Sequence, residues 1–139
     1  MEYLKLKHKL VLPTLCSAIS FSTLVGSAFA GDPVAGEKVF VRCQACHEIT
    51  PDKSKIGPSL YDVIGREAGS LSSFPMFSEA MKNSAKVWDE ANLSEFLQAP
   101  MTVIKGTRMI FTGVPAEQDR INLIAYLKSI TPREKSRTQ

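Results

Sequence analysis

The chain has 139 residues, 44% of them hydrophobic and 22% charged, and this composition predicts one modest globular domain. Without residues 1–30 it keeps 14 basic and 13 acidic residues, so its net charge is then about +1. Such a balance argues against nucleic-acid binding, which calls for basic charge clustered on one face. It also predicts weak electrostatic steering of partners over long distances.

The first thirty residues have the layout of a secretory signal. Basic residues precede an uncharged run over residues 10–30, and the run ends with small residues at Ala28 and Ala30, which suit a signal peptidase. We predict cleavage after Ala30 and export to the periplasm, with residues 31–139 as the mature domain. Cys16 would be lost with the leader. An uncleaved membrane anchor is the alternative, because about twenty uncharged residues can span a bilayer.

The mature chain is expected to open with a helix. Asp32 can cap free backbone amides, and Pro33 fits the first helical turn. Spacings of four, three and four then place four residues on one helical face, namely Gly36, Phe40, Cys43 and His47.

Loops and short helices follow. Residues 48–57 and 66–76 are polar or rich in Ser and Gly and predict loops, with a short segment over 58–65 between them and a short helix over 77–83 after them. Asp89 is expected to cap a helix that Pro100 ends, and its apolar stripe consists of Leu93, Phe96 and Leu97.

A loop over residues 101–114 leads to the last helix, which Pro115 is expected to begin. Its wide apolar face consists of Ile121, Leu123, Ile124, Leu127 and Ile130, and residues 132–139 are expected to form a flexible tail. No strand alternation or internal repeat is visible. The pattern therefore predicts an all-helical domain whose long loops wrap something, and a large flat cofactor would supply the missing core.

Cys43, Cys46 and His47 form the sequence C-x-x-C-H, the attachment signature of c-type haem. The two thiols add across the two vinyl groups at one porphyrin edge, so a short helical spacing places both sulfurs against one ring. The histidine that follows supplies the proximal ligand of the iron. Attachment of this kind belongs to compartments outside the cytoplasm, which agrees with the secretory signal. We therefore predict one covalently bound haem c.

Three other interpretations of the motif are weaker. A structural zinc site needs four ligands, and residues 31–139 hold no second cluster of Cys or His. A thioredoxin-like redox pair needs a βαβ context, which the pattern does not offer. A structural disulfide between Cys43 and Cys46 would close a loop too tight to stabilise the fold much.

The opposite face of the iron needs a second ligand, and Met or His there would make an electron-transfer site. The second histidine, His8, lies in the leader, so a methionine is favoured. Met109 lies in a loop between two helices, where Gly106 permits close approach of the backbone. Met101 is the second choice, although packing is the usual role of a methionine. The remaining candidates are Met76 and Met81.

The chain resembles the class I cytochromes c, the family of the mitochondrial protein and its bacterial periplasmic relatives. The resemblance covers nearly all of residues 31–131 and implies an all-α cytochrome c fold, with three main helices, shorter ones and long loops around one haem. It rests on Gly36 to Phe40, Lys55-Ile56-Gly57-Pro58-Ser59-Leu60, Gly65-Arg66, Val87-Trp88, Lys105 to Phe111 and Leu123-Ile124-Ala125-Tyr126-Leu127-Lys128.

The resemblance implies a role for each haem-site residue. Met109 becomes the axial ligand opposite His47, and the Pro58 carbonyl accepts a hydrogen bond from the other imidazole nitrogen, which orients the ring. Arg66 and Trp88 match positions that bond a haem propionate. Thr107 lies beside the axial ligand, and Phe111 shields the iron from water. The terminal helices are expected to cross at Gly36, Phe40, Leu123 and Tyr126.

The sequence also departs from the mitochondrial pattern. Phe77 and Phe96 stand where tyrosines occur and Met81 where an asparagine occurs, so we expect no internal polar network on that side of the haem. The family's ring of lysines is only partly rebuilt, because Met101 and Thr102 replace two of them. Docking should then depend more on apolar contact and show a shallow dependence on salt. The remaining cations of the ring are Arg42, Lys55, Lys105 and Arg108.

The function implied by the resemblance is that of a soluble, monomeric electron carrier. Its partners would be redox proteins, namely donor and acceptor complexes, membrane-bound ones included. No small-molecule substrate and no enzymatic activity are expected. The alternative is a haem enzyme or sensor with a labile sixth ligand, such as a peroxidase. The chain serving as the dedicated acceptor of one dehydrogenase would change the partner but not the chemistry.

Overall fold

A computed structural model of the chain describes residues 30–130. The predicted leader, its cleavage after Ala30 and the predicted tail over 132–139 therefore lie outside the described residues or at their edge. In the described part the secondary structure is helical: α1 is Pro33–Phe40, α2 is Glu79–Lys82, α3 is Glu90–Gln98, α4 is Pro100–Val103 and α5 is Glu117–Ser129. None of these helices is long and apolar enough to cross a membrane.

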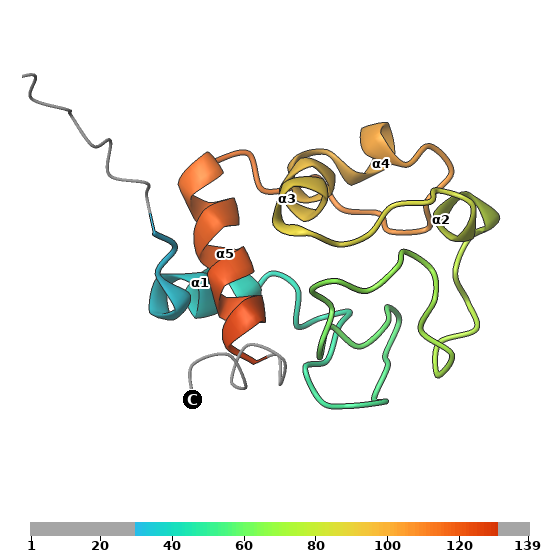
Figure 1. Cartoon of the computed structure of the whole chain (residues 1–139), viewed down its shortest axis with the longest axis horizontal. Helices are drawn as coiled ribbons and strands as arrows, with labels where there is room; N and C mark the ends of the chain where they lie inside the picture. The colour runs from blue at the N-terminus through green and yellow to red at the C-terminus, as the bar shows by residue number, and fades with distance from the viewer. Residues whose placement is uncertain (1–29, 131–139) are drawn as a thin grey trace, which may run out of the picture.

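Helices α1 and α5 come from the two ends of the described chain and pack side by side at one end of the molecule (Figure 1). The contact is close because Gly36 has no side chain: a Cβ atom there would meet the backbone oxygen of Asn122 and lie 2.8 Å from the Tyr126 Cβ. Phe40 is buried beside it, with its ring centroid 5.3 Å from that of Tyr126. The predicted crossing of the terminal helices is confirmed.

The starts of α1 and α3 follow the predicted cap chemistry. The Asp32 side chain accepts a hydrogen bond from the Val34 amide at 2.8 Å, and Pro33 is the first helical residue. The Asp89 side chain accepts one from the Asn92 amide at 2.7 Å. Both carboxylates therefore satisfy amide groups that have no partner within the helix.

Three predicted boundaries are wrong. Helix α1 ends at Phe40, before the cysteine motif, which continues as hydrogen-bonded turns. Pro100 does end α3, but it also begins α4, inside the segment predicted as a loop, because proline is tolerated at the first position of a helix. Helix α5 begins at Glu117 rather than at Pro115.

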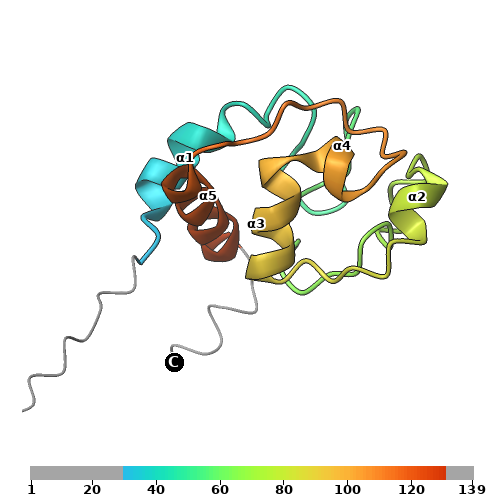
Figure 2. The ribbon, with the colours of Figure 1, turned by 90° about the horizontal axis from the view of Figure 1, so that it is seen from above.

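The loops occupy the side of the molecule away from the α1–α5 crossing, and α2 lies at the far end (Figure 2). An isolated antiparallel bridge joins Glu67 and Val87. Backbone hydrogen bonds continue it on both sides, from the Ala68 amide to Lys86 at 2.8 Å and from the Trp88 amide to Arg66 at 2.9 Å. This pairing fixes Arg66 and Trp88 next to each other without a regular sheet.

Candidate functional site

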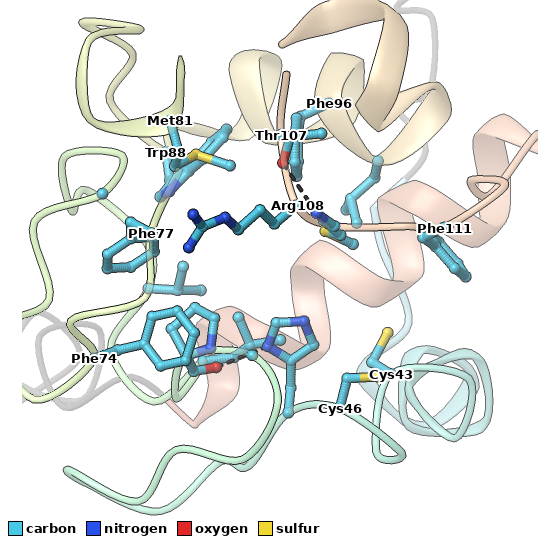
Figure 3. Close-up of a pocket in the computed structure, with 18 of the residues that line it drawn as sticks. Cys43, Cys46, Phe74, Phe77, Met81, Trp88, Phe96, Thr107, Arg108 and Phe111 are labelled. Atoms are coloured by element: carbon cyan, nitrogen blue, oxygen red, sulfur yellow. Dashed lines mark hydrogen bonds between the residues drawn. The ribbon is translucent and has the colours of Figure 1, made fainter. Parts of the chain in front are cut away.

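A cavity of about 740 Å³ lies among the cysteine motif, the loops and α3. This volume falls within the range of about 300–1,000 Å³ that is usual for cofactor and small-molecule sites. Figure 3 shows Cys43 and Cys46 on one side of it and Phe74 and Phe77 on the other. All the site residues predicted from the sequence line this cavity: Cys43, Cys46, His47, Pro58, Arg66, Trp88, Thr107 and Met109.

The motif residues share one wall because the chain continues in helical turns after α1. The Cys43 amide donates to the Phe40 carbonyl at 2.7 Å, and the His47 amide donates to the Cys43 carbonyl at 2.9 Å. Both thiols are free in this structure. Burial raises the pKa of the Cys43 thiol. Within residues 30–130 the structure shows no group of three or more His, Cys, Asp or Glu residues that could hold a metal ion.

The His47 imidazole is held by the hydrogen bond that the resemblance implies, with Nδ1 2.7 Å from the Pro58 carbonyl oxygen. A carbonyl can only accept, so Nδ1 carries the hydrogen. Burial lowers the pKa of His47; the hydrogen bond to Pro58 opposes this shift, and the positive charge of Arg66 adds to it. A neutral ring protonated at Nδ1 leaves the Nε2 lone pair free to bind a metal.

Gly57 lies directly against the His47 ring. A Cβ atom at Gly57 would be 2.8 Å from Nδ1 and 2.9 Å from Nε2, closer than packed atoms approach. The glycine is fixed there by its own backbone, since its amide donates to the Cys46 carbonyl at 2.8 Å and its carbonyl accepts from the Lys55 amide at 3.0 Å. The absence of a side chain at Gly57 thus makes room for the imidazole.

Arg66 and Trp88 reach the cavity from the paired segments. The Arg66 guanidinium donates to the carbonyls of Ser59 at 2.8 Å and Tyr61 at 3.3 Å. Trp88 is buried, with its ring centroid 4.9 Å from that of Phe96. Their role toward a propionate stays a prediction.

The wall formed by Phe77, Phe96 and Met81 has the composition that the sequence indicated. All three residues line the cavity, and none of their side chains carries an N–H or O–H group. These three side chains therefore cannot build the polar network that tyrosine and asparagine would allow.

The four methionine candidates differ in position. Met109 is half-buried and lines the cavity, and its amide donates to the Thr107 hydroxyl at 3.2 Å. Gly106 turns the chain before it with a φ of +90°, which favours glycine. Met101 is 53% exposed and is not part of the cavity wall, so the second choice from the sequence is disfavoured. Met76 and Met81 line the cavity as well and stay alternatives.

Sequence reasoning missed the contacts that hold the Met109 segment in place. Arg42 donates to the Gly113 carbonyl at 2.9 Å, and Arg108 donates to the Met76 carbonyl at 3.1 Å. The side chain of Arg108 extends toward Phe77 (Figure 3). Side chain to backbone bonds across 71 and 32 residues leave no local signal in the sequence.

Comparison with known proteins agrees with this geometry. The family model "Cytochrome c" matches residues 33–131. Cytochrome c2 of Rhodoblastus acidophilus is 50% identical over 99 residues, which cover 70% of this chain and 92% of the relative. Cytochrome c-554 of Methylosinus trichosporium is 40% identical over 116 residues, or 82% and 87% of the two chains. The structure of cytochrome cH from Methylobacterium extorquens superimposes with a TM-score of 0.68 at 40% identity and covers 71% of this chain and 99% of that one.

Proposed function

The chain belongs to the cytochrome c family, and we propose that Cys43 and Cys46 attach its haem through two thioether bonds. Membership means that it carries one covalently bound haem c and acts in single-electron transfer. We place His47 and Met109 as the two axial ligands of the iron. Pro58, Arg66, Trp88 and Thr107 complete the haem pocket in this proposal.

The residues present fit such a group. Two free thiols, an imidazole whose pKa burial lowers and methionine thioethers line one cavity that is otherwise mainly apolar. When bound, haem supplies a one-electron couple between ferrous and ferric iron. Histidine with methionine is the ligand pair that raises the reduction potential in this class of site. The apolar walls act in the same direction, because they disfavour the additional positive charge of the oxidised state.

The protein's own groups keep the site ordered and dry. Pro58 and Gly57 fix the imidazole plane of His47, and Thr107 fixes the backbone of Met109. Phe111, two residues after Met109, lines the same cavity and would shield the ligand side from water. Because the backbone holds His47 and Met109 in place, they would hold the iron in either oxidation state with little reorganisation, and no substrate would have to be transformed.

The observation that carries the ligand assignment is that Met109 and the C-x-x-C-H motif, which lie more than sixty residues apart, meet in the same cavity. The ferric protein should therefore show a sulfur-to-iron charge-transfer band in the near infrared. Met109→Ala should abolish this band, lower the reduction potential and open the iron to small ligands. Absorption spectra and a potentiometric titration measure all three effects.

Met101→Ala is the matched control, since Met101 is exposed outside the cavity and its loss should leave the band unchanged. A band that survives Met109→Ala would move the assignment to Met76 or Met81. A high-spin spectrum of the unmodified protein would instead favour the haem enzyme or sensor with a labile sixth ligand.

The partners we propose are redox proteins that dock where the cavity opens, in the periplasm, with the carrier acting as a monomer. Three exposed apolar side chains, Ile56, Met76 and Ile110, belong to the cavity wall, and Ile110 is 91% exposed. Arg42, Lys55 and Arg108 also line the cavity, whereas Lys105 does not. We infer that a partner contacts apolar side chains first and a few cations around them.

A further inference from the structure

The segment that carries Met109 has no regular secondary structure between α4 and α5, yet its backbone is held firmly after the methionine. Three consecutive carbonyl groups accept hydrogen bonds from arginine side chains. The Gly113 carbonyl accepts from Arg42 at 2.9 Å, and the carbonyls of Val114 and Pro115 accept from Arg120 at 2.9 and 2.7 Å. Hydrogen bonds from two arginine side chains thus take the place of the backbone hydrogen bonds that a helix or sheet would provide.

The two arginines act from different places. Arg120 is 7% exposed and also donates to the Ser94 hydroxyl of α3 at 3.1 Å, so it belongs to the packed interior between α3 and α5. Arg42 is exposed and directly precedes Cys43. Replacing Arg42 therefore removes a contact of the haem site, while the packed interior around Arg120 stays intact.

Arg42 touches the Met109 segment at two points. Besides its bond to Gly113, its guanidinium carbon lies 5.2 Å from the ring centroid of Phe111, within the distance of a cation–π contact. The backbone of Arg42 is itself held in place, since its amide donates to the Val39 carbonyl at 3.2 Å. The other end is packed, since Gly113 is buried with a φ of +97° and its Cα faces the backbone oxygen of Gln98.

We propose that Arg42 is a positioning residue that latches the Met109 segment to the attachment motif and so holds the methionine sulfur over the cavity. The latch joins the residue before Cys43 to residues two and four positions after Met109, and thereby connects the two halves of the site. It deepens the function proposed above, because it presupposes that Met109 is the axial ligand.

The test is the binding of imidazole to the ferric holoprotein, since imidazole enters only when the methionine leaves. Imidazole is uncharged at pH 8, so a change of surface charge alone hardly affects its binding. Arg42→Gln should bind imidazole about five to fifty times more tightly, a factor that matches one hydrogen bond and one exposed cation–π contact. Arg42→Lys keeps the charge but loses the planar fork, and it should show a smaller increase.

Lys55→Gln is the matched control. Lys55 lines the same cavity and carries the same charge, but its side chain binds the Gln44 carbonyl at 2.9 Å and Glu48 at 2.8 Å rather than the Met109 segment. Its imidazole affinity should equal that of the unmodified protein. An unchanged affinity in Arg42→Gln, or an equal increase in Lys55→Gln, would overturn the latch.

The near-infrared band separates this result from the ligand assignment. If the unmodified protein has no sulfur-to-iron band, the assignment of Met109 fails, and the latch with it. If the band is present and Arg42→Gln binds imidazole like the unmodified protein, only the latch fails. Mass spectrometry confirms one haem per chain in each variant, and Arg42→Lys carries the same test if Arg42→Gln yields no holoprotein.

Discussion

His47 is restrained from two directions, by a hydrogen bond in the ring plane and by a backbone pressed against the ring. Pro58 supplies the first and Gly57 the second, and the two residues are neighbours in the chain. An imidazole fixed in this way cannot rotate without breaking the hydrogen bond to Pro58 or moving a loop. The cost of such a rotation keeps the Nε2 lone pair in one direction.

Gly57→Ala tests this restraint. No positive φ is found at Gly57, so alanine adds only a methyl group, and that group would lie 2.8 Å from Nδ1. We expect the ring to be displaced and the free energy of unfolding of the holoprotein to fall by about 1–3 kcal/mol, as for other overpacked sites. Guanidinium unfolding and the paramagnetically shifted NMR signals of the histidine ring measure the two effects.

Lys53→Ala is the control for that variant, because Lys53 is exposed in the same loop and is not part of the cavity wall. If Gly57→Ala matched it in both stability and histidine signals, the ring would not depend on the glycine.

At the scale of single residues, the sequence predicts what is local. The spacing of Cys43, Cys46 and His47 is enough to place their side chains on one wall of the cavity, because all three residues lie within about one helical turn. The bonds from Arg42 to Gly113 and from Arg66 to Ser59 could not be predicted in this way. Their acceptors are backbone carbonyls of irregular loops, whose positions follow from the complete fold.

At the scale of elements, cap chemistry located the start of α1 and of α3, whereas α5, which has no side-chain cap, begins later than its proline predicted. Asp32 and Asp89 cap as expected because the interaction spans two or three residues. Helix α5 begins two residues after Pro115, whose carbonyl is bound by Arg120 instead of by a helical amide. The start of α5 thus carries no cap signal that the sequence could show.

At the α1–α5 crossing, helix propensity and packing are expected to change stability in opposite directions when Gly36 is replaced with alanine. On an exposed helix surface, replacing glycine with alanine stabilises by about 1 kcal/mol. At Gly36 the new methyl group would collide with the Asn122 backbone, so packing should dominate and Gly36→Ala should destabilise by about 1–3 kcal/mol. Equilibrium unfolding gives the sign directly.

Lys38→Ala on the exposed side of the same helix serves as the reference and should change stability by less than about 0.5 kcal/mol. A Gly36→Ala variant that proves more stable than the unmodified protein would show that the helices can separate at little cost.

At the scale of the whole molecule, the charge balance and the apolar side chains around the cavity decide how two such proteins meet. With a net charge of about +1 for residues 31–139, repulsion between two copies is weak. Exposed apolar groups at Ile56, Met76 and Ile110 favour close contact where the cavity opens.

Electron self-exchange between two copies measures this balance without a known partner. We expect its rate to rise by less than about threefold between low salt and 0.5 M salt, because few charges face each other. Ile110→Gln should slow self-exchange, whereas Val34→Gln, an exposed apolar position on α1 that is not part of the cavity wall, should not. A steep rise with salt would mean that the cations Arg42, Lys55 and Arg108 dominate the encounter.

The pairing of α1 with α5 also bears on the order in which the molecule is made. Helix α1, which carries the chain toward Cys43, ends at Phe40, whereas its packing partner α5 begins only at Glu117 and ends at Ser129. A nascent or unfolded polypeptide therefore cannot complete its principal helix contact until nearly all of the described residues exist. Until α5 packs against α1, we expect both thiols to remain accessible, so that a cofactor could be joined to the open chain and enclosed afterwards.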